Sequence, residues 1–341
     1  MSPTIKDIAK AARVSTATVS RVVNNPERVS PETRNRIQKI IEEMGYAPNI
    51  FARGLMRSRT DSVGILVSHL VNPYITSIVD TIESILSRSG TYIYLCNCKQ
   101  AKELEYKYTT QLLRRNVDAI IAIETLSFSS QDNFLLDFDS PCPIILVNEH
   151  VGLSSRHHIV RCDQKPGIRE ALNFFASKDL FPIALVLGDT HQYSFKIKED
   201  VLREFQREKG IPDSKIQVHY LYGDTNNENI VVKSADYAYQ LFTGRNRPRS
   251  ILAGNDLIAL GVLQAAQKTG IKIPTDLSVV GVDNTILSRT SLIPLSTIDL
   301  RTEDVGRMAA ELYLRLRNSH GQTIEPVHET LPSFLRLRAT T

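Results

Sequence analysis

The amino-acid sequence predicts an α/β protein, with an N-terminal all-α helix-turn-helix headpiece followed by a two-lobed body built on parallel sheets. Two patterns predict this fold. Apolar residues recur at helical spacing in three short segments before residue 46, and from Ser62 onward short apolar runs alternate with amphipathic segments. The chain has 341 residues, which at roughly 150 residues per domain predicts about two or three domains.

The composition argues against several classes of protein. No run of about 18 apolar residues occurs, so a membrane span is not expected. Residues 1–10 are polar and charged, without the apolar core of a secretory signal. The cysteines are too few and too scattered for a disulfide framework, and Cys96-x-Cys98 lacks the spacing of a zinc site. We therefore expect a cytoplasmic protein with reduced thiols at Cys96, Cys98, Cys142 and Cys162.

Positive charge is concentrated at the start of the chain. Residues 1–60 hold eleven Lys or Arg against five Asp or Glu, a balance of +6. The other 281 residues hold 30 basic and 32 acidic side chains. The net charge of +4 therefore hides a basic head on a slightly acidic body. A concentrated positive patch is typical of nucleic-acid binders, although basic solvated faces are also common.

Three helices are predicted in the headpiece. Thr4 can cap a helix over residues 5–12, and Asp7 completes a capping box. Ser15 can cap a second helix, which turn residues end at Asn24-Asn25-Pro26. Ser30 can cap a third helix that ends before Gly45. The side chains expected to face the headpiece core are Val19, Val22 and Val23 in the second helix and Ile37, Ile40, Ile41 and Met44 in the third.

The second of these helices suits the reading of DNA. With its valines inward, Thr16, Ala17, Ser20 and Arg21 point outward, and short side chains let the helix backbone approach base edges in the major groove. Arg21 can donate two hydrogen bonds to one guanine, and the methyl group of Ala17 can contact thymine. The alternative, a three-helix packing module with a solvated face, remains open on these features alone.

The segment of residues 47–59 joins the headpiece to the body. It carries three arginines and several apolar residues, is too short for a stable isolated helix, and is weakened further by Gly54. A segment that folds only on its partner is the simplest interpretation. Apolar wedges flanked by arginines suit the DNA minor groove, where Leu55 can enter between base steps and kink the duplex.

These motifs resemble the lactose-repressor (LacI/GalR) family of bacterial transcription regulators. The matching segments are Thr4–Ala9, Val14–Val22, Asn25, Val29-Ser30, Thr33-Arg34 and Gly45-Tyr46-x-Pro48-Asn49, with Asn49, Ala52, Arg53 and Leu55 in the hinge. Arg13 is a departure, because the family usually has Gly in this turn. The expected DNA-binding residues are Thr4, Ser15, Thr16, Ala17, Thr18, Ser20, Arg21, Asn24, Asn49, Ala52 and Leu55.

The body alternates predicted strands and helices over about 280 residues, more than one sheet usually needs, so we expect two similar lobes. The predicted strands are Val63–Val67, Tyr92–Leu95, Ala119–Ile123, Ile144–Val147, Ile183–Leu187, Ile216–Tyr220, Ser250–Ala253 and Ser278–Val282, with a helix near Tyr74–Ser89. The family resemblance extends over this region and implies a periplasmic-binding-protein-like fold, in which the chain crosses between lobes three times.

The resulting domain boundaries are a headpiece at residues 1–47, a hinge at 48–60 and an effector-binding and dimerisation domain at 61–341. We expect the crossings near 160–163, 290–295 and 319–323. The first lobe would then hold residues 61–160 and 294–320, and the second lobe residues 161–293 and 321–341.

Ligands in open parallel sheets bind beyond the carboxyl ends of the strands. This rule selects 68–74, 148–149, 188–198, 255–256 and 283–284. Polyol ligands need carboxylates, amides and an aromatic face, and Tyr74, Asn148, Asn255 and Asp283 supply these groups. Asn72-Pro73-Tyr74, Gly254–Gly261 and Val279–Asn284 match family motifs. The alternatives to ligand binding are a helix-cap role for Asp283 and purely structural roles for Tyr74 and Asn148.

The segment after Gly188 departs from the family. The family has an effector-gripping Arg followed three residues later by Gly, where this chain has Lys198 and Val201. Lysine lacks the bidentate fork of arginine. At Thr225 and at residues 300–302, the chain also lacks the residue types with which the family contacts its ligand. The expected effector-binding residues are therefore Tyr74, Asn148, Lys198, Asn255 and Asp283, and a sugar, an unusual or phosphorylated ligand, and a degenerate pocket all stay open.

No nucleotide-binding loop or hydrolase elbow occurs, and His157-His158 is expected to be a surface or strand pair rather than a metal site, so neither an enzyme nor a cofactor is predicted. The resemblance implies a repressor that binds a pseudo-palindromic operator as a homodimer, under control of a small-molecule effector. One alternative is the same DNA-binding fold controlled by a protein partner or by none. A binding protein or enzyme with an incidental basic head is less expected.

Overall fold

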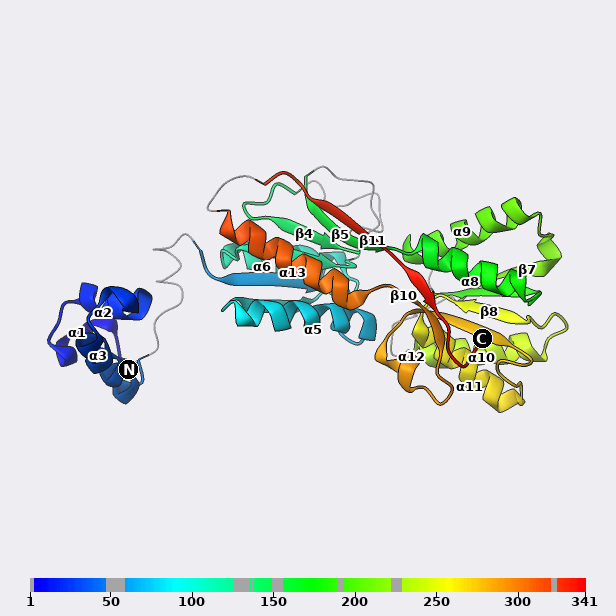
Figure 1. Cartoon of the computed structure of the whole chain (residues 1–341), viewed down its shortest axis with the longest axis horizontal. Coiled ribbons are helices and arrows are strands. Elements are labelled where there is room, and N and C mark those ends of the chain that lie inside the picture. The colour runs from blue at the N-terminus through cyan, green and yellow to red at the C-terminus, as the bar shows by residue number, and fades with distance from the viewer. Residues whose placement is uncertain are drawn as a thin grey trace. The chain divides into compact units, whose positions relative to one another are not determined.

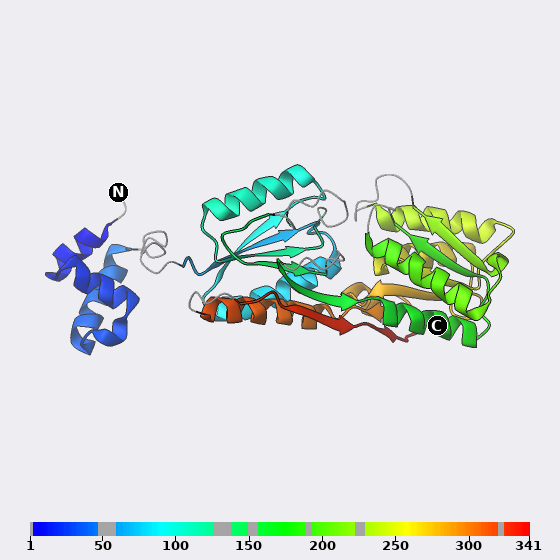
Figure 2. The same ribbon diagram turned by 90° about the horizontal axis from the view of Figure 1, so that it is seen from above.

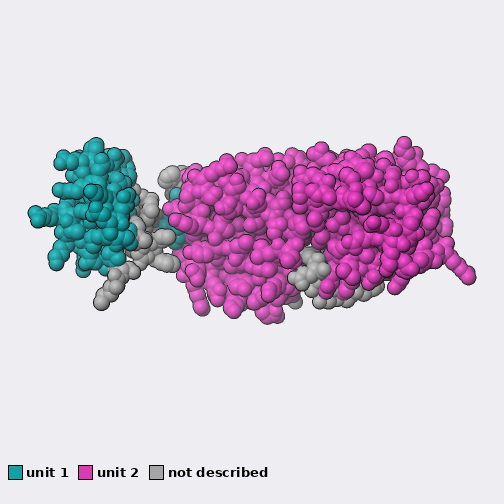
Figure 3. Space-filling view, turned by 90° about the horizontal axis from the view of Figure 1, so that it is seen from below, with its two compact units in different colours: residues 1–60 teal, residues 61–341 magenta. Residues whose placement is uncertain are grey.

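The computed structural model describes residues 3–46, 59–125, 135, 138–148, 156–188, 193–221, 229–319 and 324–341. The chain forms two compact units, residues 1–60 and residues 61–341, which Figure 3 shows in different colours. Among the described helices, none is long and apolar enough to cross a membrane.

The headpiece is a three-helix unit around its own small core. Its elements are α1 (Ile5–Ala12), α2 (Thr16–Asn24), a 3-10 turn (Pro26–Arg28) and α3 (Pro31–Met44). Ile8, Val19, Val22 and Ile37 are buried at its centre, because the apolar faces of the helices converge there. The predicted capping box forms, since Thr4 accepts from the Asp7 N–H and the Asp7 carboxylate accepts from the Thr4 N–H.

Two details of the third helix differ from the prediction. Ser30 stands at the N-cap of α3, but its hydroxyl donates to Thr33 Oγ1 at 3.0 Å instead of capping the backbone. Met44, expected in the apolar stripe, is 37% exposed, because it lies in the last turn, beyond the reach of the core formed around Ile37. Gly45 ends the helix in the left-handed conformation, as the sequence predicts.

The described part of the body contains two sheets of six strands each, with the same strand order. The two lobes that hold these sheets are seen in Figures 1 and 2. The first sheet has the order β11-β5-β4-β3-β1-β2 and the second β12-β10-β9-β8-β6-β7. The first sheet consists of β1 (Ser62–Val67), β2 (Tyr92–Asn97), β3 (Ala119–Ile123), β4 (Ile144–Val147), β5 (His158–Asp163) and β11 (His328–Pro332). The second consists of β6 (Ile183–Leu187), β7 (Ile216–Tyr220), β8 (Ser250–Ala253), β9 (Ser278–Asp283), β10 (Ser296–Asp299) and β12 (Phe334–Arg336).

Helices cover both faces of each sheet, which explains why the central strands are continuous apolar runs. Every residue of β1, β3, β4, β6 and β8 is buried. The longer helices of the body are α5 (Pro73–Arg88), α6 (Lys102–Arg114), α8 (Lys165–Ser177), α9 (Tyr193–Lys209), α10 (Ile230–Thr243), α11 (Asp256–Thr269) and α13 (Thr302–Asn318), with a short α12 (Ile286–Thr290). In Figure 1, α5 and α13 lie side by side, and they pack against each other.

Strand pairing corrects the expected lobe boundaries. β10 pairs with β9, so residues 296–299 belong to the second sheet, whereas the crossing was expected before them, near 290–295. β11 pairs with β5, so residues 328–332 belong to the first sheet, although the third crossing was expected near 319–323. The first crossing is close to its expected place, since β5 ends at Asp163 and α8 begins at Lys165.

We define the first lobe as residues 61–163 and 302–332 and the second lobe as residues 165–299 and 334–341. The chain crosses between them at 163–165, 299–302 and 332–334. The sheets are parallel except for one pair, because β12 runs antiparallel to β10. The expected locations of the second and third crossings were wrong for a physical reason. The sheet that a short strand joins is decided by partners far away in sequence, not by the strand's own pattern.

Candidate functional site

The first candidate site is the outward face of α2 in the headpiece. Thr16, Ala17 and Arg21 are exposed on this face, while Val19 and Val22 are buried on the opposite face. Ser20 is half-buried, and Lys6 and Lys10 on α1 are exposed. The arrangement presents small side chains and one arginine on a helix that follows a tight turn, the geometry by which a helix-turn-helix enters the major groove.

Three of the predicted DNA-binding residues hold the ends of helices. Thr4 caps α1, and the Ser15 hydroxyl accepts from the Thr18 N–H at 3.1 Å while exchanging a 2.9 Å hydrogen bond with the Thr18 hydroxyl. The hydrogen bonds from Thr4 hold the pKa of Asp7 below its usual value. The side chain of Asn24, and all of Asn49, Ala52 and Leu55, lie outside the described residues.

The second candidate site lies where the carboxyl ends of the strands in the two lobes meet. In the first sheet Val67, Ile123 and Val147 are in register, so the residues that follow them reach the same edge. Glu124 and Asn148 stand there, both with left-handed backbone, at φ +45° and +53°. Asp283 ends β9 of the second sheet with φ +116°. Strained backbone of this kind concentrates at functional sites.

The side chains of Tyr74 and Asn148 interact mainly with each other. Their side chains are 3% and 2% exposed, and the Asn148 amide donates to the Tyr74 hydroxyl. Asn148 Oδ1 also accepts from the Cys162 N–H at 2.8 Å. Burial is the main cause that raises the pKa of Tyr74 well above its usual value. In this conformation the pair links α5 to the ends of β4 and β5, and neither side chain offers a face to solvent.

Lys198 is a buried lysine in the cleft. It projects from α9, is 3% exposed, and its ammonium donates to Gln164 Oε1 at 2.7 Å and to the Ser194 carbonyl oxygen at 3.1 Å. The ammonium also lies 5.4 Å from the ring centre of Phe195. Burial lowers the pKa of Lys198 to about 8, against the opposing charges of Asp283 and Glu124.

Two carboxylates face this lysine from different lobes. Burial raises the pKa of Glu124 to about 7, and the charge of Lys198 opposes the rise. Burial, followed by the charge of Asp256, raises the pKa of Asp283 well above its usual value, again against Lys198. Within the described part of the chain, neither carboxylate accepts a hydrogen bond.

Asn255 and Asp256 begin α11 and hold this end of the second lobe together. Asn255 Oδ1 accepts from the Ile258 N–H at 2.9 Å and caps the helix. The fully buried Asp256 accepts from the Thr285 N–H, the Thr285 hydroxyl and the Thr297 hydroxyl at 2.8, 2.9 and 2.6 Å. Burial still raises the pKa of Asp256 to about 6. Asp283 does not cap a helix, because Thr285 is the N-cap of α12.

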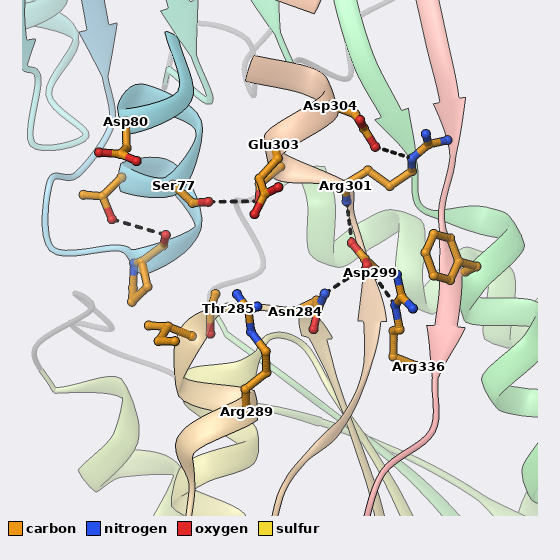
Figure 4. Close-up of a pocket in the computed structure, with 15 residues that line it drawn as sticks. Ser77, Asp80, Asn284, Thr285, Arg289, Asp299, Arg301, Glu303, Asp304 and Arg336 are labelled. Carbon is orange, nitrogen blue, oxygen red and sulfur yellow. Dashed lines mark hydrogen bonds and ion pairs between the residues drawn. The ribbon is translucent and has the colours of Figure 1, made fainter. Parts of the chain in front are cut away.

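A cavity of about 740 Å³ lies beside this cluster, between α5 and the start of α13 in the first lobe and the residues after β9 in the second (Figure 4). Asp299 stands where the chain crosses. It accepts from the Arg301 N–H at 2.8 Å, from Asn284 at 2.9 Å and from Arg336 at 3.1 Å. Arg301 also pairs with Asp304 at 2.9 Å. None of the five predicted effector residues lines this cavity, although Pro73 and Asn284 beside Tyr74 and Asp283 do.

Comparison with known proteins covers both units. Residues 4–49 match the model of the bacterial regulatory proteins of the lacI family, and residues 172–341 match that of the periplasmic binding protein-like domain. The transcriptional regulator DegA of Bacillus subtilis is 30% identical over 344 residues, covering 100% of this chain and 98% of that protein. Catabolite control protein A of Staphylococcus epidermidis is 30% identical, with 100% of both chains covered.

This chain belongs to the LacI family.

As a LacI-family protein, the chain is a DNA-binding transcription regulator. Among solved structures, a lac repressor dimer bound to operator and an anti-inducer matches with a TM-score of 0.84 and 25% identity, covering 100% of this chain and 99% of that one. The LacI-family fold predicted from the sequence, a helix-turn-helix headpiece with a two-lobed body, is therefore confirmed.

Sequence reasoning missed Glu124, whose charge interacts with that of Lys198. The signal that identifies it was present, since Glu124 directly follows a five-residue apolar strand and therefore stands at a strand's carboxyl end. The His157-His158 pair is not at the surface. Both rings are buried, His158 begins β5, and burial lowers the pKa of both.

Proposed function

We propose that this chain is a repressor that binds a pseudo-palindromic operator as a homodimer and is controlled by a small molecule in the interlobe cleft. The observation that carries the proposal is the outward face of α2, with exposed Thr16, Ala17 and Arg21 over a buried valine face. In this proposal α2 enters the major groove, and Leu55 in the hinge wedges into the minor groove. Such a role requires the compartment that holds the chromosome, so we propose a cytoplasmic location.

The dimer follows from the small size of one reading unit. A single three-helix headpiece buries little surface on DNA, and two of them on a two-fold axis read half-sites about one helical turn apart. The operator-bound lac repressor is itself a dimer. Light scattering of the purified chain tests the dimer.

The experiment that tests operator recognition is selection of bound duplexes from a random DNA pool at two salt concentrations. We expect a centred palindrome with a flexible central step to be enriched at both. Binding that enriches no motif and collapses as salt rises would reduce the interaction to phosphate contact and contradict the proposal. The selected duplex then serves as the probe for effectors, which change its affinity if they prefer one state of the lobes.

A second candidate keeps DNA binding but replaces the small molecule with a protein partner or with no control. One observation favours it. Tyr74 and Asn148 already satisfy each other, Lys198 is bound by Gln164, and Asn255 caps a helix, so four of the five predicted effector residues have partners within the chain. A ligand panel separates the two candidates, because only the first requires a small molecule that stabilises the body.

A further inference from the structure

Three arginines stand together on one loop of the second lobe. Arg245, Arg247 and Arg249 occupy alternate positions between α10 and β8, and all three are exposed. Among the described residues, their guanidinium groups make no ion pair and no hydrogen bond. No contact within the described chain therefore accounts for this cluster of positive charge.

The loop that carries the arginines is held in place by neighbouring strands. The Arg249 N–H donates to the Pro182 carbonyl oxygen at 2.9 Å, and the Arg249 carbonyl oxygen accepts from the Ser278 N–H at 3.0 Å. The Gln217 amide of β7 donates to the Asn246 carbonyl oxygen at 3.1 Å. Because the backbone is already ordered, a group that binds these arginines does not have to order the loop as well.

Two lysines extend the same surface. Lys215 is exposed, and its ammonium lies 4.9 Å from the ring centre of Phe181, the residue before Pro182. Lys178 is exposed at the end of α8, three residues before Phe181. We refer to five cations as the basic end of the second lobe: Lys178, Lys215, Arg245, Arg247 and Arg249.

Acidic side chains do not neutralise the basic end. Three carboxylates lie on the loops around it, those of Asp179, Asp213 and Asp276. Asp213 accepts from the Gln206 amide at 2.7 Å, and Asp276 accepts from the Lys272 N–H at 3.0 Å. Asp179 is exposed and has no side-chain partner among the described residues. The surface is therefore net positive, although residues 61–341 as a whole hold 30 basic and 32 acidic side chains.

The chemistry of the basic end favours a nucleic-acid backbone over a protein partner. Protein interfaces are built around apolar and aromatic anchors, but no large apolar side chain is exposed in the described segments 177–182, 211–217 and 243–250. Protein–DNA interfaces are polar and strongly positive, and a guanidinium group can give two hydrogen bonds to one phosphate. The cations stand on loops and helix ends, so no element is placed to read bases in a groove.

The basic end is separated from the point where the headpiece joins the body. The body begins at Asp61, next to the amino end of β1, and the cleft lies at the carboxyl ends of the strands in both lobes. The basic end lies at the amino ends of β6, β7 and β8. Within the body it is therefore on the other side of the cleft from Asp61 (Figure 1).

We propose that the basic end binds the phosphate backbone of a second DNA duplex, independently of its sequence, so that the regulator connects two DNA segments. The family already makes the chain a DNA-binding protein through its headpiece. A weak second contact is sufficient, because a regulator that is bound to DNA meets neighbouring segments at a high local concentration. The inference does not depend on which bases α2 reads.

The test is capture of a second duplex by the full-length chain. A biotinylated duplex is immobilised, the chain is bound to it, and capture of a fluorescent duplex of random sequence is measured at several salt concentrations. We expect capture to weaken by about tenfold or more in Arg245→Ala/Arg247→Ala/Arg249→Ala, with retention of the chain on the first duplex unchanged. The slope of log affinity against log salt is expected to fall by about 2 or more, since up to three phosphate contacts are lost.

A matched control removes the same charge from the first lobe. Lys102→Ala/Lys107→Ala/Arg114→Ala takes three exposed cations from α6 and is expected to change capture by less than about twofold. Asp179→Asn removes the exposed carboxylate beside Lys178 and is expected to strengthen capture by about twofold, a gain that misfolding does not produce. Equal capture by the arginine variant and the α6 control overturns the proposal.

Poly-L-glutamate tests for an acidic protein in place of DNA. If it binds the wild-type chain more tightly than the random duplex does, and the arginine variant loses this binding, the basic end serves an acidic polypeptide and the proposal is wrong. Operator selection keeps the headpiece separate. If no palindrome is enriched but capture still depends on the three arginines, the function proposed for α2 fails and the second contact stands. If a palindrome is enriched and capture does not depend on them, only the second contact fails.

Discussion

At the scale of the residue, the headpiece contains two helix ends with the same backbone and different side chains. Arg13 closes α1 at φ +53°, and its N–H donates to the carbonyl oxygens of Ala9 and Lys10. Gly45 closes α3 at φ +61°. A residue with a Cβ atom pays about 1–2 kcal/mol for the left-handed conformation, and glycine does not. The chain thus tolerates strain at the turn that leads into α2.

This pair gives a matched prediction. Arg13→Gly is expected to stabilise the headpiece by about 0.5–1 kcal/mol, since relief of strain exceeds the extra freedom of glycine in the unfolded state. Gly45→Ala is the reverse change and is expected to cost about 1 kcal/mol, although no atom lies within 4 Å of the added Cβ. Urea unfolding followed by circular dichroism measures both. Equal stability of Arg13→Gly and wild type would mean that the conformation at Arg13 is not strained.

Arg21 carries the second residue-scale prediction. If α2 lies in the major groove, Arg21→Ala removes a bidentate contact to a base and is expected to weaken binding of the selected operator by about 1–3 kcal/mol while relaxing the preference at one position. The matched control is Lys39→Ala on α3, which removes a similar charge next to Glu43. Unchanged sequence preference in Arg21→Ala would rule out the reading role of this residue.

The residue scale also shows where sequence reasoning succeeds and where it stops. The caps at Thr4 and Ser15 were predictable, because their partners are three residues away. The mutual bond of Tyr74 and Asn148 was not, since the two residues are 74 positions apart and only the folded sheet brings them together. Glu124 was predictable in principle from its place after a strand, but its charge interaction with Lys198 of the other lobe was not.

At the scale of the element, local pattern predicts strands well and their sheets poorly. Five strands, β3, β4, β6, β7 and β8, have the predicted bounds. Four of them are fully buried short apolar runs, and β7 is half-buried. β10 and β11 were missed, since Ser296–Asp299 and His328–Pro332 carry too few apolar residues to be recognised alone. Their membership of opposite sheets is fixed by pairing with β9 and β5. This is why the expected crossings were displaced.

The packing of α10 against α11 gives the element-scale prediction. Gly261 lies where the two helices approach, and a Cβ there would collide with the Ser234 hydroxyl, the Val231 carbonyl oxygen and the Ala235 nitrogen, the last at 2.8 Å. Two of these atoms are backbone and cannot rotate away. Gly261→Ala is therefore expected to destabilise the body by about 1–3 kcal/mol, even though alanine favours helices.

Gly244 supplies the control for this substitution. It ends α10 at φ −78°, and the nearest atom to an added Cβ is 3.4 Å away. Gly244→Ala is expected to leave stability unchanged or to raise it by up to about 1 kcal/mol. The midpoints of urea unfolding compare the two variants. If both behave alike, the close approach of α10 and α11 does not depend on the missing side chain.

At the scale of the whole molecule, the lobes are joined covalently at three crossings and electrostatically across the cleft. Asp299 holds the second crossing to the third by accepting from both Arg301 and Arg336. Glu124 of the first lobe faces Lys198 of the second. Burial disfavours the charged form of both groups, which makes the stability of the folded body depend on pH.

Glu124 sets the direction of that dependence. Its pKa is raised from 4.5 to about 7 in the folded chain, so the folded state holds more protons than the unfolded state between these values. The stability that this group contributes is present below pH 4.5 and is lost as the pH rises through about 7. Lys198, lowered to about 8, acts in a different window, since its contribution is present above pH 10.5 and is lost as the pH falls through about 8.

The substitution Glu124→Gln keeps the shape of the side chain and removes its titration. Relative to wild type, Glu124→Gln is therefore expected to gain about 1–3 kcal/mol of unfolding free energy as the pH rises from about 5 to 8. Urea unfolding of both proteins in buffers of equal ionic strength measures this difference. A difference that stays constant across the range would show that Glu124 titrates in the folded chain as it does in the unfolded chain, and would contradict burial as a cause that raises its pKa.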